Sequence, residues 1–485
     1  MESLKKNLIY NIIYQILIII LPLITAPYIA RVLGAEKVGI YSYTYSIAYY
    51  FSIFSMLGIS NHGNRMIAST KKDKNKMSII FWSIYAIQFV LFIISITAYI
   101  MYLLFFVKNN RLVFAIQTIY IISGMFDISW LFFGLEKFKI TVTRNIIIKI
   151  FTVLAIFLFV KNENDLTKYT LIMVLGTLFS QIYLWRYVKK EVYSIKIDKD
   201  VIIQNIKPIL ILFIPVLSFS IYKVMDKIML GNMSNYTQVG YYNNAEKIIN
   251  IPMGIITALG AVMLPRMSSL IAEGENRKSE NYIIMSIKLV TILASAISFG
   301  LMGISSIFTP IFFGNGFSGC TPIIILLSVT VFFISWANVV RTQFLIPNHY
   351  DKVYIYSTIL GAIINLILNL IFIPKYQAVG AAIGTIAAEF TLMFVQVFSI
   401  RKRVNIFEII FQYSLFIILG IVMMFVVQGI GKIMGESIKT LIVQILSGSI
   451  IYCLGALILL KFKNDELFKN VSDIIYKVLR IKIWC

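Results

Sequence analysis

Long apolar runs alternate with short polar breaks along the whole chain. Many runs reach 18 residues or more, and about 20 apolar helical residues cross a hydrocarbon core of ~30 Å. The pattern predicts an all-α polytopic membrane protein with about fourteen transmembrane helices. The predicted spans are 8–31, 40–61, 79–106, 112–134, 145–161, 169–188, 207–230, 241–264, 282–307, 320–346, 355–373, 380–400, 408–428 and 441–460.

Two of the polar breaks carry the same motif. The sequence LGAEKVGIY at 33–41 is echoed by LGNMSNYTQVGYY at 230–242. An Arg-Met pair follows each motif at the same distance, since Gly39 to Arg65 and Gly240 to Arg266 are both 26 residues. The equal spacing predicts that the same helical hairpin occurs twice. Six spans per repeat give both halves the same orientation, as in transporters whose site lies between two parallel repeats.

The repeat divides the chain into four predicted parts. An N-terminal lobe of helices 1–6 covers 1–206, and a C-terminal lobe of helices 7–12 covers 207–407. Helices 13 and 14 occupy 408–460, and a basic tail covers 461–485. Apolar residues at helical spacing among lysines and arginines predict that the tail is an amphipathic helix on an anionic inner leaflet.

Prolines recur in the first helix of each lobe. Pro22 and Pro27 lie in helix 1, and Pro208 and Pro215 lie in helix 7. Because proline removes a backbone hydrogen bond, these residues are predicted to interrupt or kink both helices. Ordinary kinks and a gating hinge are both open interpretations.

The distribution of charge sets the orientation. Charged residues make up 14% of the chain, compared with about a quarter in a soluble domain. The loops on the side of both termini hold 29 Lys and Arg residues, and those on the other side hold 9. The excess predicts a cytoplasmic membrane protein with both termini in the cytoplasm. The net charge of +22 is therefore explained by orientation, and no nucleic-acid partner is expected.

No enzyme signature is present in the sequence. The only two histidines, His62 and His349, lie in predicted cytoplasmic loops, and the three cysteines form no motif. A phosphate-binding GxxxxGK[ST] loop is absent, and the predicted outer loops are short. The sequence therefore favours transport over catalysis, with no metal and no cofactor.

Ionisable residues inside predicted spans are the candidate site, because such residues are costly in a bilayer and usually face a cavity. Lys223, Asp226 and Lys227 share one face of helix 7, either as cavity lining or as a self-satisfied structural group. Lys149 either lines the cavity or reaches back to the cytoplasmic end of its helix. Lys288 is expected to reach back to the cytoplasmic end of its own helix. The predicted substrate-binding residues are Arg31, Lys149, Lys223, Asp226, Lys227, Glu246 and Lys247.

Two further acids are candidates for a coupling ion. Glu389 lies near mid-depth without a basic neighbour on its own helix, so it either bonds to another helix or binds a proton or cation. Asp127 lies nearer the cytoplasm, as does Arg341. The buried set as a whole is more basic than acidic, which favours an anionic substrate such as a phosphate or pyrophosphate.

Several stretches resemble Wzx-type polysaccharide flippases of the multidrug, oligosaccharidyl-lipid and polysaccharide exporter superfamily. They are PYIARVLGAEKVGIYSYTYSIAYYF, FDISWLFFGLEKFKITVTRN, DKIMLGNMSNYTQVGYYNNAEKI, QFLIPNHYDK and AIINLILNLIFIPKYQAVGAAIGT. The resemblance implies a two-lobe, alternating-access transporter of undecaprenyl-pyrophosphate-linked oligosaccharide, with a proton or sodium gradient as a plausible driving force. The counterparts of the family's basic cavity residues are Arg31, Lys149, Lys223, Lys227 and Lys247.

The expected function is movement of lipid-linked repeat units from the inner to the outer leaflet, for a capsule, O-antigen (lipopolysaccharide) or teichoic-acid type polymer. The expected partners are the lipid-linked oligosaccharide, membrane lipids, and the polysaccharide polymerase and glycosyltransferases of the pathway. Two alternatives stay open: an integral-membrane polymerase or ligase of the same pathway, and a small-molecule drug antiporter of the same superfamily. A drug antiporter for cations should carry a surplus of buried acid, which this chain does not.

Overall fold

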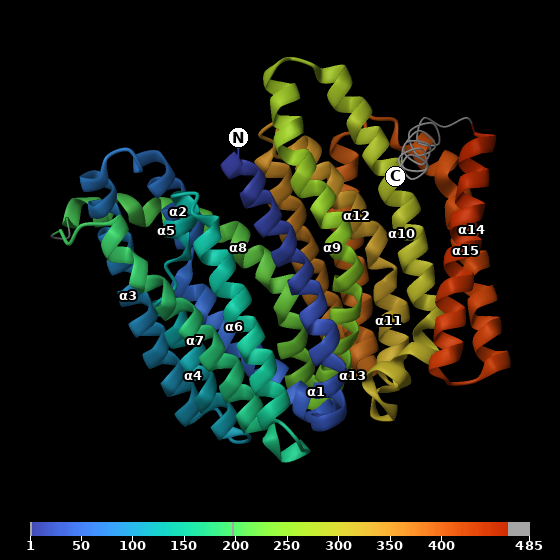
Figure 1. Cartoon of the computed structure of the whole chain (residues 1–485), viewed down its shortest axis with the longest axis horizontal. Coiled ribbons are helices and arrows are strands. Elements are labelled where there is room, and N and C mark those ends of the chain that lie inside the picture. Colours follow the sequence, from blue (N-terminus) through green and yellow to red (C-terminus); the bar gives the residue numbers. More distant parts are fainter. Residues whose placement is uncertain (1, 196–197, 464–485) are drawn as a thin grey trace, which may run out of the picture. The chain divides into compact units, whose positions relative to one another are not determined.

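The computed structural model describes residues 2–195 and 198–463, with the backbone alone for residues 2–20, 219, 222, 223, 406, 407 and 410. Every regular element in these ranges is helical (Figure 1). Eleven of the helices found there are long and apolar enough to cross a membrane, by length and composition only. The predicted all-α polytopic fold is confirmed, and the count of about fourteen spans stays a prediction.

The chain forms two compact units, Met1–Asn243 and Asn244–Cys485. The first unit contains α8 and the start of α9, whereas the predicted lobe boundary falls between residues 206 and 207, before most of α8. The predicted amphipathic helix begins at 464 and lies outside the described residues.

In the first unit, α1 packs against α3, α4, α6 and α8, and α7 packs against α4 and α6. One buried apolar cluster joins residues of α2, α3, α5, α7 and α8, and a second joins α1, α4, α6 and α7. The helices are α1 (Glu2–Met56), α2 (Ile59–Thr70), α3 (Lys74–Phe105), α4 (Arg111–Met125), α5 (Ser129–Gly134), α6 (Phe138–Phe159), the short η1 (Glu163–Asp165), α7 (Leu166–Glu191), α8 (Lys199–Met233) and the first turns of α9 (Tyr236–Ala272).

The predicted single span 112–134 is broken in the structure between α4 and α5. A break inside a membrane leaves backbone carbonyls that need donors. Gln88 supplies them from α3, since its Nε2 lies 3.0 Å from the Gly124 oxygen and 2.9 Å from the Asp127 oxygen. Trp130 donates from Nε1 to Gln88 Oε1 at 3.1 Å, which fixes the amide. The break is therefore built into the core and was not visible in the apolar pattern.

The predicted loop at 31–39 is a single corner. Gly34 has φ 74° and ψ 170°, and α1 is helical on both sides of it. Positive φ is open to glycine at little steric cost, so this residue alone turns the chain. The helix α1 continues through Pro22 and Pro27, so neither proline interrupts it, and a kink at these residues stays a prediction. The helix α8 likewise continues through its two prolines.

The prediction that His62 lies in a loop is also wrong. It belongs to α2, an amphipathic helix that buries Ile59, His62 and Ile67 on one face. The imidazole Nε2 lies 2.5 Å from Asn205 Oδ1 of α8. The segment reads as a loop because its outward positions are polar, although its inward positions keep a helical period.

In the second unit, α10 packs against α11, α12, α14 and α15, and α12 packs against α13. Within α13 the backbone leaves the helix at Gln377, with φ 52° and ψ −127°, which separates the predicted spans 355–373 and 380–400. The elements here are the rest of α9, α10 (Asn276–Phe313), η2 (Asn315–Phe317), α11 (Cys320–Ser328), α12 (Thr330–Val340), η3 (Arg341–Leu345), α13 (Asp351–Ser399), α14 (Ile406–Met434) and α15 (Ile438–Phe462).

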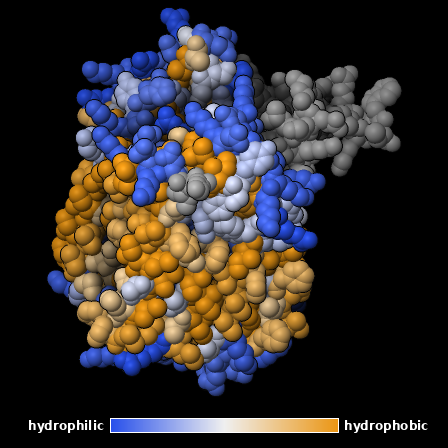
Figure 2. All heavy atoms as spheres, turned by 90° about the vertical axis from the view of Figure 1, so that its left-hand side faces the viewer, coloured by the Kyte–Doolittle hydropathy of each residue, from blue (hydrophilic) through white to orange (hydrophobic). Residues whose placement is uncertain are grey.

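The outer surface of the first unit matches a hydrocarbon solvent. On the face shown in Figure 2, hydrophobic residues form a broad band between hydrophilic ends. Along α3, for example, Val90 is 54%, Ile94 60% and Leu104 61% exposed. Apolar side chains in such numbers on the outside are expected where lipid, and not water, surrounds the helices.

The two repeated motifs meet inside the first unit at Gly39 and Gly240. A Cβ built on Gly39 would overlap the Tyr236 carbonyl oxygen, and one built on Gly240 would overlap the Ala35 carbonyl oxygen. Ala35 precedes Gly39 by the same four positions that separate Tyr236 from Gly240. The two contacts are therefore equivalent under the repeat. Beside them, the Tyr43 hydroxyl donates to Asn232 Oδ1 at 2.5 Å.

Replacing either glycine should destabilise the first unit. Gly39→Ala and Gly240→Ala each place a methyl group where a backbone carbonyl lies, and overpacking of this kind costs about 1–3 kcal/mol. We expect a lower thermal unfolding midpoint for each purified variant in detergent. Gly429→Ala in α14 is the control, because a Cβ there has nothing within 4 Å. Equal midpoints for all three variants would contradict the close approach.

Candidate functional site

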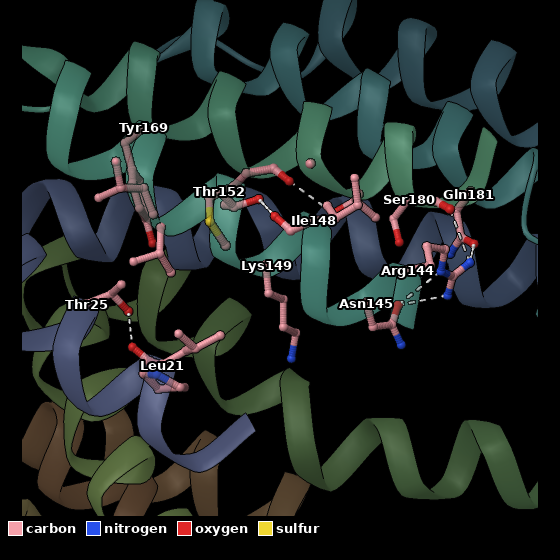
Figure 3. A pocket seen from close by; sticks show the side chains of 16 residues that line it. Leu21, Thr25, Arg144, Asn145, Ile148, Lys149, Thr152, Tyr169, Ser180 and Gln181 are labelled. Carbon is pink, nitrogen blue, oxygen red and sulfur yellow. Dashed lines mark hydrogen bonds between the residues drawn. The ribbon is translucent and has the colours of Figure 1, made fainter. Parts of the chain in front are cut away.

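A pocket of about 410 Å³ lies between α1, α6 and α7 of the first unit (Figure 3). Its α1 wall is formed by Leu21, Pro22 and Thr25, and its other walls come from α6 and α7. The Thr25 hydroxyl donates to the Leu21 carbonyl at 3.0 Å, so this wall presents mainly carbon to the pocket. The polar groups come from the opposite side.

Helix α6 supplies both charged residues of the lining. Asn145 and Lys149 are four residues apart and share one helix face, and Arg144 and Ile148 form the adjacent row. The helix α7 approaches α6 closely at Gly176, where an added Cβ would crowd Thr152 Oγ1. This approach brings the polar end of α7 against the same side of α6.

Arg144 is fixed by neutral acceptors. Its Nε and Nη2 donate to Asn145 Oδ1 at 3.1 and 2.9 Å. Its Nη1 donates to Gln181 Oε1 at 3.0 Å and to the Ser180 carbonyl at 3.2 Å. The side chain is buried, with the residue only 5% exposed. The acceptors of these four bonds are neutral oxygens, and the bonds hold the guanidinium in place.

Lys149 is the second cation of the pocket. It is half-buried on α6, and in Figure 3 its side chain runs away from the helix with the ammonium at the far end. Among the 16 lining residues shown, Arg144 and Lys149 are charged and none is acidic. The described lining therefore carries two positive charges, which is the arrangement that binds a phosphate or carboxylate.

Of the predicted substrate-binding residues, Lys149 lines this pocket, and Arg144 is a lining residue that the sequence did not single out. The predicted helix began at 145, which placed Arg144 in a cytoplasmic loop, whereas α6 begins at Phe138. Asn145 and Gln181 were missed because neutral amides carry no signal of burial. A helix start seven residues earlier would have put both cations on one helix.

Asp226 and Lys227, the described side chains of the predicted charged face of α8, do not line this pocket. Asp226 is 1% exposed and accepts a 2.6 Å hydrogen bond from the Tyr242 hydroxyl, which ties α8 to α9. Lys227 is half-buried beside it, and Arg31 is exposed one turn before the Gly34 corner. The Lys223 side chain is outside the described part of the structure. The cavity role of these residues stays a prediction.

The remaining candidates are distributed over both units. Glu246 and Lys247 are half-buried on the part of α9 that belongs to the second unit, where Lys247 Nζ lies 3.4 Å from Asn244 Oδ1. Glu389 is buried within α13 at 4% exposure. Asp127 lies in the break after α4, where its Oδ1 accepts a 2.9 Å bond from the Ser129 amide.

Other predicted cations have aromatic neighbours. Lys288 Nζ lies 5.5 Å from the centroid of the Tyr413 ring, and the Arg341 guanidinium lies 5.7 Å from that of Tyr354. Within the described ranges, no group of three His, Cys, Asp or Glu side chains is placed to hold a metal ion.

Comparison with known sequences gives a family match over more than half of the chain. A family model described as "Polysaccharide biosynthesis protein" matches residues 4–271. The "Putative O-antigen transporter" of Escherichia coli (strain K12) is 27% identical over 394 residues, which are 80% of this chain and 94% of that protein.

Comparison with solved structures shows the fold. "Lipid II flippase MurJ, inward closed conformation" aligns with a TM-score of 0.77 at 16% identity, covering 94% of this chain and 98% of that one. An inward-facing multidrug resistance MATE family transporter of the MOP superfamily aligns with a TM-score of 0.63 at 13% identity, covering 82% of this chain and 98% of that one. The helical arrangement is therefore one that transport proteins use.

The charge of the pocket can be tested by cysteine labelling. In a chain without its native cysteines, Lys149→Cys should react faster with an anionic sulfonate thiol reagent than with a cationic ammonium reagent, because Arg144 attracts the anion. We expect a ratio of rates of about tenfold, since a pair of unit charges at 4 Å interacts by about 1–4 kcal/mol between bulk water and a protein surface. The rates are followed by mass spectrometry.

The control is Leu154→Cys on the same helix. Leu154 is 51% exposed and does not line the pocket, so a membrane-embedded thiol there should react slowly with both reagents. Introducing Arg144→Gln beside Lys149→Cys should bring the two rates together. A preference that survives this change would refute the role assigned to Arg144.

Proposed function

The chain belongs to the family of polysaccharide biosynthesis proteins, and on that premise we propose that it is a flippase for lipid-linked oligosaccharides. Family membership confirms the resemblance that the sequence motifs carry. The chain is a multi-pass membrane protein, and its fold is shared with transporters. We propose that it moves undecaprenyl-pyrophosphate-linked repeat units from the inner to the outer leaflet of the cytoplasmic membrane.

The names of the related proteins support transport of a glycan precursor. One relative is named as an O-antigen transporter, and the MurJ structure is named as a lipid II flippase. A further relative from Staphylococcus aureus is named as a capsular polysaccharide biosynthesis protein. We propose a capsule, O-antigen or teichoic-acid type product, with the polymerase and glycosyltransferases of that pathway as partners.

The observation that carries the proposal is the pair of cations in the pocket of α6. A lipid-linked saccharide has its negative charge in the phosphate group that joins lipid and sugar. Arg144 and Lys149, on the next turn, place two positive charges near such a group in a site lined otherwise by apolar and neutral polar side chains.

We propose alternating access as the mechanism. The predicted lobes 1–206 and 207–407 would move against each other, and both termini would lie in the cytoplasm. The pyrophosphate would bind the cations of the first unit while the lipid tail stays in the bilayer. Arg31, Lys223, Lys227 and Lys247 are proposed as further contacts for the saccharide, and Glu389 and Asp127 as sites for a coupling ion.

The two alternatives make different demands on the site. An exporter of cationic drugs needs acidic groups, whereas the described lining of the α6 pocket has two bases. A polymerase or ligase must join repeat units, so purified protein that lengthens lipid-linked saccharide in detergent would support that alternative. Transport of labelled lipid across liposomes without chain growth would support the flippase.

Neutralising the α6 pair should slow transport. For Arg144→Gln together with Lys149→Gln we expect at least a tenfold lower rate, because a hydrogen bond to a charged group contributes about 1.5–3 kcal/mol. The measurement is the appearance of fluorescent lipid-linked oligosaccharide in the outer leaflet of proteoliposomes. Lys139→Gln is the matched control, because Lys139 is exposed on α6 and lies outside the pocket. An unchanged rate at equal reconstitution would overturn the assignment.

The α8 pair is tested separately. If Lys223 and Lys227 contact the substrate, neutralising both should lower outer-leaflet glycan in cells while the amount of protein in the membrane stays normal. Lys207→Gln, near the predicted cytoplasmic end of the same helix, serves as control. Unchanged export would remove these two residues from the site and leave the α6 pocket as the binding region.

A further inference from the structure

A second cavity, of about 360 Å³, lies in the second unit between α10, α12, α13 and α14. Its lining is aromatic and aliphatic except for Thr291 and Arg401. The Thr291 hydroxyl donates to the Ile287 carbonyl at 2.7 Å and accepts a 3.0 Å bond from Trp336 Nε1. This cavity, called the slot below, is therefore mainly apolar. Its one hydroxyl group already donates one hydrogen bond and accepts another.

One wall of the slot is a row of phenylalanines on α13. Phe390, Phe394 and Phe398 follow one another at four-residue spacing, and successive ring centroids are 5.9 Å apart. They are 47%, 53% and 50% exposed. In a helix that spans the bilayer, half-exposed rings face lipid, so the slot is bordered by the hydrocarbon region.

The row ends at a basic turn. The Arg401 guanidinium carbon lies 3.3 Å from the centroid of the Phe398 ring, a cation–π contact that holds the cation at the end of the row. Lys402 and Arg403 follow and are exposed. Arg403 Nη1 lies 3.7 Å from Glu280 Oε1, so part of its charge is balanced, whereas Arg401 borders the slot itself.

We propose that the slot holds one acyl chain of an anionic membrane phospholipid, whose phosphate is bound by Arg401. The apolar walls fit a hydrocarbon chain, and the cation lies where the chain would join its head group. A planar guanidinium binds phosphate through paired hydrogen bonds. The occupant is a bilayer lipid and not the transported molecule, because the half-exposed rings of α13 border the slot on the hydrocarbon region, where such lipids are abundant. The site is independent of the proposed transport function.

Trp336 provides a probe inside the slot. Bromine atoms on an acyl chain quench tryptophan fluorescence on contact, and Trp336 is one of five tryptophans in the chain. The signal of Trp336 is the difference between the unaltered protein and Trp336→Phe in the same vesicles. We expect brominated phosphatidylglycerol to half-quench it at about a fivefold lower mole fraction than brominated phosphatidylcholine, the effect of one basic side chain on an anionic lipid.

Three variants distinguish binding in the slot from contact with ordinary surrounding lipid. Arg401→Gln should abolish the preference for phosphatidylglycerol, while Lys402→Gln, an exposed neighbour that does not line the slot, should keep it. Val397→Trp narrows the slot and should weaken quenching by both lipids. The Trp336 signal is here the difference between Val397→Trp and the double variant that also carries Trp336→Phe. Equal quenching by both lipids, or a preference unaffected by Arg401→Gln, would mean exchanging surrounding lipid only and would overturn the proposal.

The source of the chain is tested by competition. Unlabelled phosphatidylglycerol should restore the Trp336 signal, and undecaprenyl phosphate should do so only at a higher mole fraction. If undecaprenyl phosphate displaces the brominated lipid at the lower mole fraction, the slot holds a polyprenyl tail and the proposal is wrong.

Discussion

The structure of the first unit depends on how closely two backbones approach at Gly39 and Gly240. Each glycine faces a carbonyl oxygen of the other motif, and neither position has room for a Cβ. Contact at this distance is possible only with glycine at both places. The part of α1 that follows Gly34 therefore packs against the start of α9 through two equivalent contacts, one from each copy of the motif. The surrounding aromatic packing, including Tyr43 against Tyr236, follows from this approach.

The second constraint is that a bilayer offers no hydrogen bonds to an open backbone. The corners of α1 and α13 meet it by turning within one residue, at Gly34 and Gln377. The break between α4 and α5 meets it with a side chain, since Gln88 donates to carbonyls that the break leaves open. At these three places the irregular backbone is either a turn at one residue or a break whose carbonyls accept from a buried amide.

The all-α membrane fold was predictable because the length of each apolar run indicates a spanning helix. The repeat of two lobes, inferred from the equal spacing of Gly39 to Arg65 and of Gly240 to Arg266, stays a prediction. The α6 pocket was predictable only in part. Lys149 stands out as a charge within an apolar run, but Arg144 lies at the edge of that run and reads as a loop residue. Its partners Asn145 and Gln181 are neutral, and their role depends on the packing of α6 against α7, which no local pattern reports.

The neutral partners of Arg144 decide what the pocket can do. A carboxylate in their place would form a buried ion pair, and an incoming anion would then have to compete with it. The amide and carbonyl oxygens of Asn145, Gln181 and Ser180 orient the guanidinium and add no full negative charge of their own. A transport site must also release what it binds, so two cations with different freedom are better suited than a rigid cage. In the proposed mechanism, Arg144, which is held by at least four bonds, would set the position of the anion, while Lys149, on a flexible stem, would add attraction that a small movement of α6 can withdraw.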